Sequence, residues 1–221
     1  MKTSLYVTYD GLLDPLGQSQ IIPYLYNLNC KGYKFIIISF EKIHENKLKI
    51  QALRKELDRK GFEWIILPFN KGKINFLGRL ISGSFQIKQI LLSRKIDLVH
   101  LRGCYPGLIF KLTFSNTKYL YDLRAFFGQW ADGGITKYHS IAYKISLFIE
   151  RRLIKKAAAI IVLDKSGKEF IEENFLIKAP IFLIPCSTNI KNYNTYEQNK
   201  VPEQQTIKLV YLGGGRFPPY R

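Results

Sequence analysis

The stretch SLYVTYDGLLDPLGQSQIIPYL (residues 4–25) decides the fold class of this chain. It begins with an apolar, strand-like run (4–9), and a long helical pattern starts at residue 18. The segment between them and the first helical residues hold two Asp, two Gly, Pro, Gln and Ser, whereas a structural turn needs two or three such residues. In an open α/β sheet, ligands usually bind at the connection that follows a strand. The stretch therefore predicts a strand, a ligand-binding loop and a helix.

The rest of the chain repeats the alternation of strand-like and helical segments. FIIIS (35–39) and IIVL (160–163) are continuously apolar, as strands buried on both faces are. Such alternation favours a mostly parallel sheet with helices on both faces, so the sequence predicts a Rossmann-like, doubly wound α/β domain. The predicted strands are 4–9, 33–40, 62–67, 97–101, 118–122, 158–163 and 181–185, and the predicted helices are 18–31, 43–60, 75–94, 105–114, 138–157 and 165–174.

The composition changes near residue 187. We expect the α/β domain to span residues 1–186 and a polar linker to span 187–206. The run IKLVYLGGG (207–215) then reads as a fresh strand that enters a Gly-rich turn. Residues 207–221 are therefore predicted to begin a second α/β domain that is incomplete within these 221 residues.

The composition also limits the class of protein. With 47% hydrophobic residues the chain can bury a core, and no apolar run approaches the ~20 residues of a membrane span. The N-terminal run is too short and too polar for a signal peptide, so we expect a cytoplasmic protein. Cys30, Cys104 and Cys186 have no metal-like spacing, which predicts reduced thiols and no metal site.

The charge is extreme, with 34 Lys and Arg against 17 Asp and Glu, a formal net charge of +17. This balance favours nucleic acid, anionic lipid or phosphorylated ligands, although a lysine-rich proteome would produce it as well. A nucleic-acid site needs basic residues interleaved with exposed aromatic residues, or a recognition motif. Neither pattern is present, so we expect no nucleic-acid partner.

The opening loop offers a place for sugar or phosphate oxygens. Backbone N–H groups at a helix start bind such oxygens, Gly17 lets a ligand or backbone approach closely, and Gln18 and Ser19 add hydrogen bonds. An ordinary turn at Asp14–Pro15 followed by a plain helix start explains the same residues. The three spaced glycines of a dinucleotide site are absent, which argues against an NAD-dependent dehydrogenase.

Two further strands end in polar side chains. His100 and Arg102 lie two residues apart in DLVHLRGCYPG (97–107), so they share a face and favour binding of a sugar hydroxyl and an anion. A partly buried His and a surface Arg are the alternative. Asp122 and Arg124 repeat the spacing before an aromatic, Gly-bearing loop that could stack on a sugar or a lipid. This second pair could equally be an ion pair that supports the loop.

Two apolar helical segments carry an excess of positive charge. No acidic residue lies between Glu63 and Asp97, and Glu150 is the one acidic residue in the segment 137–157. Apolar and basic helices favour an anionic membrane surface, although each could simply pack on the sheet and solvate its lysines. The residues predicted to face a membrane are Lys71, Lys73, Arg79, Lys88, Arg94, Lys95, Arg151, Arg152, Lys155 and Lys156.

Together these motifs resemble the N-terminal, acceptor-side domain of family 4 of the retaining GT-B glycosyltransferases. The resemblance covers essentially the whole chain and rests on YDGLLDPLGQSQIIPYL, DLVHLRG, YDLRAFFGQWADGG, AAAIIVLDKSGKEFI, IPCSTN and LVYLGGG, in the family's order. It implies a hexosyl transfer from a nucleotide-sugar to a saccharide or lipid-linked acceptor in bacterial surface polysaccharide synthesis, at the inner face of the plasma membrane. It also implies that no cofactor or protein-bound metal is needed, because basic side chains and N–H groups stabilise the pyrophosphate.

The resemblance also assigns the residues that line the cleft. They are Gly17, Gln18, Ser19, His100, Arg102, Asp122, Arg124, Asp164 and Ser166. The family's donor-binding pair of glutamates belongs to a C-terminal domain that these 221 residues do not contain, and Asn189 stands where many relatives have Asp. We therefore expect no transfer activity without that domain. A non-catalytic membrane- or polyanion-binding module with the same fold is the alternative.

Overall fold

The computed structural model describes residues 2–42, 47–69, 73–128 and 137–187, with the backbone alone for 73–75 and 142. The chain forms two compact units, Met1–Thr188 and Asn189–Arg221. The second unit lies outside the described residues, as do most of the predicted linker and the predicted strand at 207–215.

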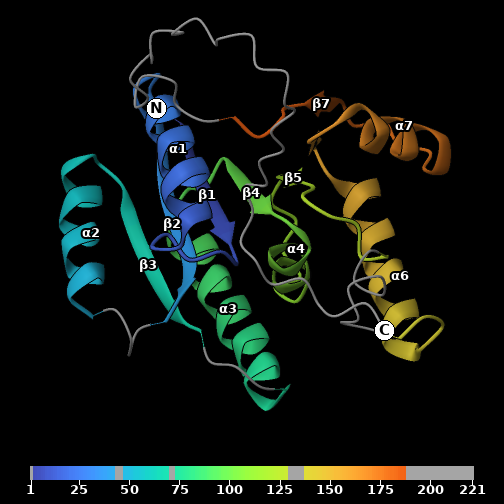
Figure 1. Cartoon of the computed structure of the whole chain (residues 1–221), viewed down its shortest axis with the longest axis horizontal. Coiled ribbons are helices and arrows are strands. Elements are labelled where there is room, and N and C mark those ends of the chain that lie inside the picture. Colours follow the sequence, from blue (N-terminus) through green and yellow to red (C-terminus); the bar gives the residue numbers. More distant parts are fainter. Residues whose placement is uncertain (1, 43–46, 70–72, 129–136, 188–221) are drawn as a thin grey trace, which may run out of the picture. The chain divides into compact units, whose positions relative to one another are not determined.

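The described unit is built on one sheet of seven parallel strands (Figure 1). Their order is β3-β2-β1-β4-β5-β6-β7, which confirms the predicted doubly wound α/β fold. The strands are β1 (Lys2–Thr8), β2 (Tyr33–Glu41), β3 (Glu63–Pro68), β4 (Leu98–Arg102), β5 (Tyr119–Asp122), β6 (Ala159–Val162) and β7 (Ile181–Leu183).

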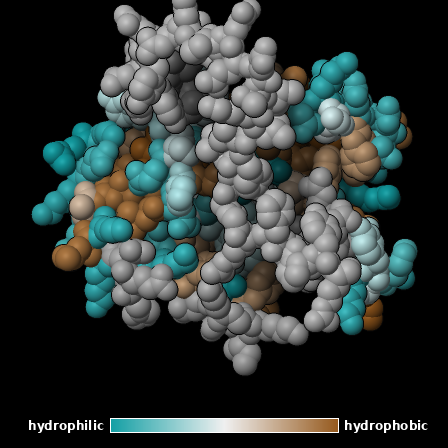
Figure 2. Space-filling model, in the orientation of Figure 1, coloured by the Kyte–Doolittle hydropathy of each residue, from teal (hydrophilic) through white to brown (hydrophobic). Residues whose placement is uncertain are grey.

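Helices connect these strands and cover both faces of the sheet. They are the π-helical turn η1 (Gly17–Ile21), α1 (Ile22–Asn29), α2 (Lys47–Arg59), α3 (Lys73–Ser93), α4 (Cys104–Lys111), α6 (Ile141–Lys156) and α7 (Lys165–Asn174). Within the described ranges, none of these helices is both long and apolar enough to cross a bilayer. Figure 2 shows hydrophilic side chains gathered over α2 and α7, at opposite edges of the view.

The core divides into two layers because side chains alternate along each strand. Leu5 and Val7 of β1 join buried residues of α3, α4 and α6 on one face of the sheet. Tyr6 lies between them in sequence and joins η1, α1 and α2 on the other face. β2 and β6 are therefore buried on both sides along most of their length, as their continuous apolar runs predicted, whereas β7 at the edge of the sheet is largely exposed.

The strand order places a crevice between β1 and β4. β1 pairs with β2 on one side and β4 on the other, so the connections after β1 and β4 leave in opposite directions. The register aligns Thr8 with Arg102, and Arg102 with Asp122. The carboxyl ends of β1, β4 and β5 therefore lie level with one another, at the point where such sheets usually bind ligands.

Candidate functional site

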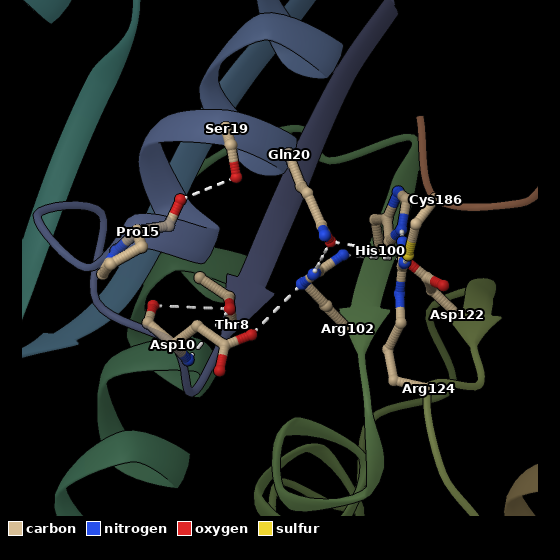
Figure 3. A network of polar contacts seen from close by, with 10 residues as sticks. All are labelled: Thr8, Asp10, Pro15, Ser19, Gln20, His100, Arg102, Asp122, Arg124 and Cys186. Carbon is tan, nitrogen blue, oxygen red and sulfur yellow. Dashed lines mark hydrogen bonds and ion pairs between the residues drawn. The ribbon is translucent and has the colours of Figure 1, made fainter. Parts of the chain in front are cut away.

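Asp122, the last residue of β5, lies at the centre of a buried polar group (Figure 3). Its side chain is 1% exposed. Oδ2 of Asp122 accepts a hydrogen bond from Nη2 of Arg124 over 2.8 Å, and it lies 3.3 Å from Nε2 of His100 and 3.8 Å from Nη1 of Arg102. Three basic side chains therefore share one carboxylate.

These neighbours determine the charge of Asp122. Burial alone would raise its pKa, but the hydrogen bond and charge of His100, together with Arg124, lower the pKa below its usual value. Asp122 is therefore ionised at neutral pH. Its second oxygen, Oδ1, and Nε of Arg124 are buried and have no hydrogen-bond partner within the described part of the chain. A water molecule or a ligand hydroxyl would satisfy such atoms.

Arg102 connects the end of β4 to the opening loop. Its Nε donates to Oδ2 of Asp10 over 3.2 Å, and its Nη2 donates to Oε1 of Gln20 over 3.0 Å. Figure 3 shows the three side chains converging from β4, from the end of β1 and from the helix start. The guanidinium thus ties together the two connections that diverge at the crevice.

A pocket of about 170 Å³ lies beside Arg102, and we name it the switch-point pocket. Gly103 borders it with a φ of 84°, which lies in the left-handed region that favours glycine. This conformation lets the chain turn from β4 directly into α4. The residues that line the pocket are Tyr9, Asp10, Arg102, Gly103, Cys104, Tyr105, Pro106, Arg124 and Ala125.

A buried carboxyl group holds the opening loop in place. Glu41, at the end of β2, accepts hydrogen bonds from N–H of Leu12 over 2.5 Å and from the hydroxyl of Ser39 over 2.7 Å. Trp64 in turn donates to Ser39 over 2.8 Å. Burial raises the pKa of Glu41. The loop after β1 is thus anchored to β2 and β3, and its shape is set before any ligand binds.

The three residues predicted from the opening loop serve the loop itself. A Cβ at Gly17 would overlap the carbonyl oxygen of Gly11 and would lie 2.6 Å from Cα of Leu12, so Gly17 permits close backbone packing. Gln18 donates to the carbonyl of Leu12 over 2.6 Å, and Ser19 donates to that of Pro15 over 2.7 Å. Gln18 and Ser19 remain exposed, whereas Gly17 is buried and is approached by backbone of its own loop.

The expected position of His100 needs correction. The side chain is buried, with its ring 4.5 Å from Tyr6 and 6.1 Å from Tyr24 between ring centroids. It therefore supports Asp122 from beneath and does not line the crevice. Asp122 is buried as well and acts on the crevice through its two arginine partners. Arg102 is also largely buried, so the expected alternative of a surface Arg does not hold either.

A second and larger pocket, of about 700 Å³, lies over the ends of β5 and β6, and we name it the aromatic pocket. Asp164 and Ser166 line it, and Asp164 also caps α7 by accepting from N–H of Gly167 over 2.7 Å. Arg124 and Ala125 border both pockets. The other residues that line it are Leu123, Phe126, Gly128, Tyr138, Tyr143, Val162, Leu163, Gly167 and Phe170.

The loop between the two pockets is anchored by Glu150 of α6. The N–H of Phe127 donates to Oε1 of Glu150 over 2.6 Å in a buried environment. Burial raises the pKa of Glu150 to about 7, although the hydrogen bond from Phe127 opposes this rise. Trp130, Gly133 and Gly134 of the same predicted loop lie outside the described residues.

Sequence reasoning missed several residues of the two pockets and of the polar contacts around Arg102. Asp10 was noted only as part of a loop, and Gln20 lies in the same motif as Gln18 but was given no role. The signal for Gln20 was available, because residues 17 and 20 are one helical turn apart and share a side of the helix. Tyr138 and Tyr143 fall within one predicted helix, 138–157, and only the fold brings them together with Phe170 of α7.

The predicted membrane-facing residues divide into two groups. Arg79 is only 7% exposed, and its guanidinium lies 5.2 Å from the ring of Phe69 and 6.0 Å from those of Tyr9 and Phe76. This prediction was wrong for Arg79, because that side of α3 packs against aromatic side chains. Lys71 and the side chain of Lys73 lie outside the described residues. The exposed members are Lys88, Arg94, Lys95, Arg151, Arg152, Lys155 and Lys156, of which Arg94 forms an ion pair with Glu63.

Apolar side chains lie exposed on the same two helices. On α3, Leu77, Ile81 and Phe85 recur every four residues and are 60%, 60% and 67% exposed. Leu92 extends this row along α3. On α6, Ile141, Ile145 and Phe148 form a similar row. Both helices cover the same face of the sheet, on either side of α4. We name these two rows the exposed stripes.

No group of three or more His, Cys, Asp or Glu side chains that could hold a metal ion occurs among the described residues.

Comparison with known proteins gives a fold but no family. No protein-family model matches the sequence, and no curated protein sequence matches it. Solved structures do match. Sucrose-phosphate synthase from Thermosynechococcus elongatus is 12% identical with a TM-score of 0.59, over 86% of this chain and 49% of that one. A glycosyltransferase from Rickettsia africae ESF-5 is 19% identical with a TM-score of 0.53, over 86% and 44%.

A third solved structure gives the same result. Phytolacca americana UGT2, solved with UDP-2fluoro-glucose and pterostilbene, is 9% identical with a TM-score of 0.55, over 84% of this chain and 54% of that one. The chain spans about half the length of these structures. At these identities the likeness establishes the fold alone, a Rossmann-like half of the kind that GT-B glycosyltransferases contain.

Proposed function

We propose that this chain is the acceptor-binding half of a family 4 glycosyltransferase. The complete enzyme would transfer a hexose from a nucleotide-sugar to a membrane- or lipid-linked saccharide during synthesis of bacterial surface polysaccharide. The similarity to solved glycosyltransferases supports the reaction class, and the order of the sequence motifs supports the family. The Phytolacca protein is complexed with both UDP-2fluoro-glucose and pterostilbene, a nucleotide-sugar analogue and a second organic compound.

The observation that carries this proposal is the pair of hydrogen bonds from Arg102 to Asp10 and Gln20. They lie at the crevice between β1 and β4, where the chain connections leave in opposite directions. A salt bridge that only stabilised the fold could lie anywhere, whereas this one lies where parallel sheets bind ligands. The Asp10 carboxylate is partly exposed and can accept further hydrogen bonds, for example from sugar hydroxyls. Arg102 fixes the position of that carboxylate, and Asp122 fixes the position of Arg102 and Arg124.

In this proposal the chain's own residues bind and orient the acceptor. Glu41 and Glu150 hold the two loops that border the switch-point pocket, so the acceptor would meet a preformed surface. The donor nucleotide and the groups that stabilise its pyrophosphate would belong to a second domain, and no resident metal or cofactor is required. The 221-residue chain alone is therefore expected to bind the acceptor without catalysing sugar transfer to it.

The exposed stripes support a membrane-linked acceptor. Apolar side chains that lie exposed in a row mark interaction surfaces more often than scattered ones do, and lysines and arginines flank the stripes on both helices. An apolar face with basic residues beside it suits the boundary of an anionic lipid surface. The protein would then act at the cytoplasmic face of the plasma membrane. The same stripes favour the second candidate function, a membrane-binding module with no role in transfer.

A binding measurement with the full chain separates the two functions. Saccharide lipids extracted from bacterial membranes would be titrated in detergent micelles, with empty micelles and anionic lipid micelles as references. We expect binding that exceeds both references and that Asp10→Asn weakens about tenfold, because the variant loses the charged acceptor on Arg102. Equal binding to saccharide lipids and plain anionic lipids would support the membrane module. Turnover of a radiolabelled nucleotide-sugar by the chain alone would overturn its assignment as a half-enzyme.

A further inference from the structure

The aromatic pocket has the size and the lining of a small-molecule site. Its volume of about 700 Å³ lies within the range of roughly 300–1,000 Å³ that such sites occupy. Three separate parts of the described chain form it: the loop after β5, the region around the start of α6, and the turn from β6 into α7. Like typical ligand pockets, it combines an apolar wall with a few polar groups.

Four aromatic rings form the apolar wall in two pairs. Phe126 and Phe170 lie 4.7 Å apart between ring centroids, at an interplanar angle of 68°. Tyr138 and Tyr143 lie 5.6 Å apart at 60°. Phe170 is 45% exposed although it is a large apolar side chain. The face of an aromatic ring attracts polarised C–H groups, such as those on the apolar face of a pyranose ring.

Polar groups face the same space from the turn between β6 and α7. Asp164 uses Oδ1 to cap α7, and a carboxylate has about four acceptor sites in all, so most of them remain for a ligand. Ser166 adds a hydroxyl that both donates and accepts. Sugar hydroxyls need such a mixture of donors and acceptors, whereas a hydrocarbon chain would leave these groups without partners.

The charge of the pocket selects among saccharides. Arg124 is the one cationic side chain among the described lining residues, and Asp122 already holds its guanidinium at 2.8 Å. Asp164 adds a negative charge to the wall. The negative charge of a uronic acid or a sugar phosphate would therefore be repelled by Asp164. The Arg124 guanidinium, which could offset this repulsion, is already paired with Asp122. A neutral sugar meets no such opposition.

We propose that the aromatic pocket is a subsite for a neutral pyranose, with the aromatic rings against its C–H face and Asp164 and Ser166 on its hydroxyls. This inference rests on the proposed function, because the neutral sugar would be part of the acceptor. It extends that function by naming the class of sugar and by placing it over β5 and β6, beside the switch-point pocket.

The test uses the full 221-residue chain and saturation-transfer NMR with soluble glycosides. The neutral probes are the methyl glycosides of glucose, galactose and mannose, and the anionic probes are methyl glucuronide and glucose 1-phosphate. At least one neutral glycoside is expected to bind about tenfold more tightly than either anionic probe. Phe170→Ala and Asp164→Asn are each expected to weaken that binding about fivefold or more.

The variants are chosen so that the fold survives. Asn caps helices as well as Asp does, so Asp164→Asn keeps the bond to Gly167. Glu172→Gln on the same helix removes a charge away from the pocket and serves as the matched control. Thermal melting of all three variants against the unmodified chain verifies that they are folded.

The possible results are distinct. If methyl glucuronide or glucose 1-phosphate binds more tightly than the neutral glycosides, the inference that the pocket takes a neutral sugar is overturned. Neutral binding that Asp10→Asn weakens but Phe170→Ala and Asp164→Asn do not would overturn the subsite and leave the proposed function standing. If no glycoside binds while saccharide lipids do, the pocket inference alone fails. If neither the glycosides nor the saccharide lipids bind, the pocket inference and the proposed function both fail.

Discussion

Nη2 of Arg124 donates a hydrogen bond to Oδ2 of Asp122 over 2.8 Å, and the carboxylate that accepts it is almost completely buried. The sequence left open whether this pair was structural or part of a site. In the fold it is both, since Asp122 is packed among strands while Arg124 borders the switch-point pocket and the aromatic pocket. A buried carboxylate thus sets the position of a guanidinium that a ligand can reach.

Replacing Asp122 by Asn is predicted to destabilise the chain strongly. Arg102 and Arg124 would lose the charge that compensates them, and removing one partner of a buried ion pair costs about 3–5 kcal/mol. The pKa of Asp122 is lowered in the folded state, so its contribution is present above the unfolded value of 3.8 and is lost as the pH falls through the folded pKa. In urea unfolding, the free energy of unfolding of Asp122→Asn should lie well below that of the unmodified chain at pH 7. This difference should shrink as the pH falls below 3.8.

Asp58→Asn is the control for this prediction, since Asp58 lies exposed on α2 and its removal should change the free energy of unfolding by less than about 0.5 kcal/mol. A stability of Asp122→Asn equal to that of the control would mean that the buried charges are not coupled as the distances indicate.

Replacing Gly17 by Ala tests whether the opening loop depends on close backbone packing. The added Cβ would overlap backbone atoms of Gly11 and Leu12, and backbone cannot move aside as a side chain can. Overpacking of this kind costs about 1–3 kcal/mol, measured as the free energy of unfolding. Gly78→Ala in α3 is the matched control, because nothing lies within 4 Å of its Cβ and Ala favours a helix. If both substitutions stabilise the chain, Gly17 has no packing role.

The strands were predictable because their physical signal is local. Runs such as FIIIS are apolar at every position only when both faces of a strand are buried, and β2 shows buried side chains from Phe35 to Glu41 without a break. The parallel arrangement of the strands followed from their alternation with helices, whereas their order came from the structure alone. The second unit, in contrast, lies outside the described residues, and its prediction remains untested.

The site was less predictable because it depends on which face of an element meets which neighbour. α3 is apolar on two sides, with Leu80 and Ile87 against the sheet and Leu77 and Phe85 exposed, so the sequence did not reveal that Arg79 would be buried. The opening loop was ambiguous for a related reason. Gly17 indicated close approach of a ligand or of backbone, and only the fold shows that backbone of Gly11 and Leu12 lies there.

Replacing Glu150 by Gln is predicted to flatten the dependence of stability on pH. Glu150 is buried, and its pKa rises from 4.5 to about 7 on folding. Its contribution is therefore fully present below pH 4.5 and is lost as the pH rises through 7, by roughly 3 kcal/mol at most. Gln keeps an acceptor for N–H of Phe127 without a buried charge. The variant should exceed the unmodified chain in stability at pH 8, and the difference should vanish below the unfolded pKa of 4.5.

Urea unfolding at a series of pH values measures this difference, and Glu173→Gln on the exposed end of α7 is the control, since its side chain is solvated. A difference between Glu150→Gln and the unmodified chain that stays constant from pH 5 to pH 8 would show that Glu150 does not titrate in this range.

Removing the apolar side chains of the exposed stripe on α3 is predicted to release the chain from anionic membranes. Leu77, Ile81 and Phe85 already face water, so the triple substitution to Ser should leave the melting temperature almost unchanged. Burial of apolar groups at the lipid boundary contributes about 0.8 kcal/mol per CH₂, so the loss should weaken binding more than tenfold. Co-sedimentation with vesicles of phosphatidylglycerol and phosphatidylcholine measures the effect.

The control removes equally exposed leucines elsewhere, Leu48 on α2 and Leu176 after α7, which are 81% and 96% exposed. It should bind vesicles as the unmodified chain does. Because Lys88 and the exposed cations of α6 would contribute through charge, binding should also weaken as salt rises and the Debye length falls from about 10 Å at 0.1 M to about 3 Å at 1 M. If the control and the triple variant lose binding equally, the attraction is not located on α3. If neither loses it at low salt, charge alone accounts for the membrane contact and the stripe has another partner.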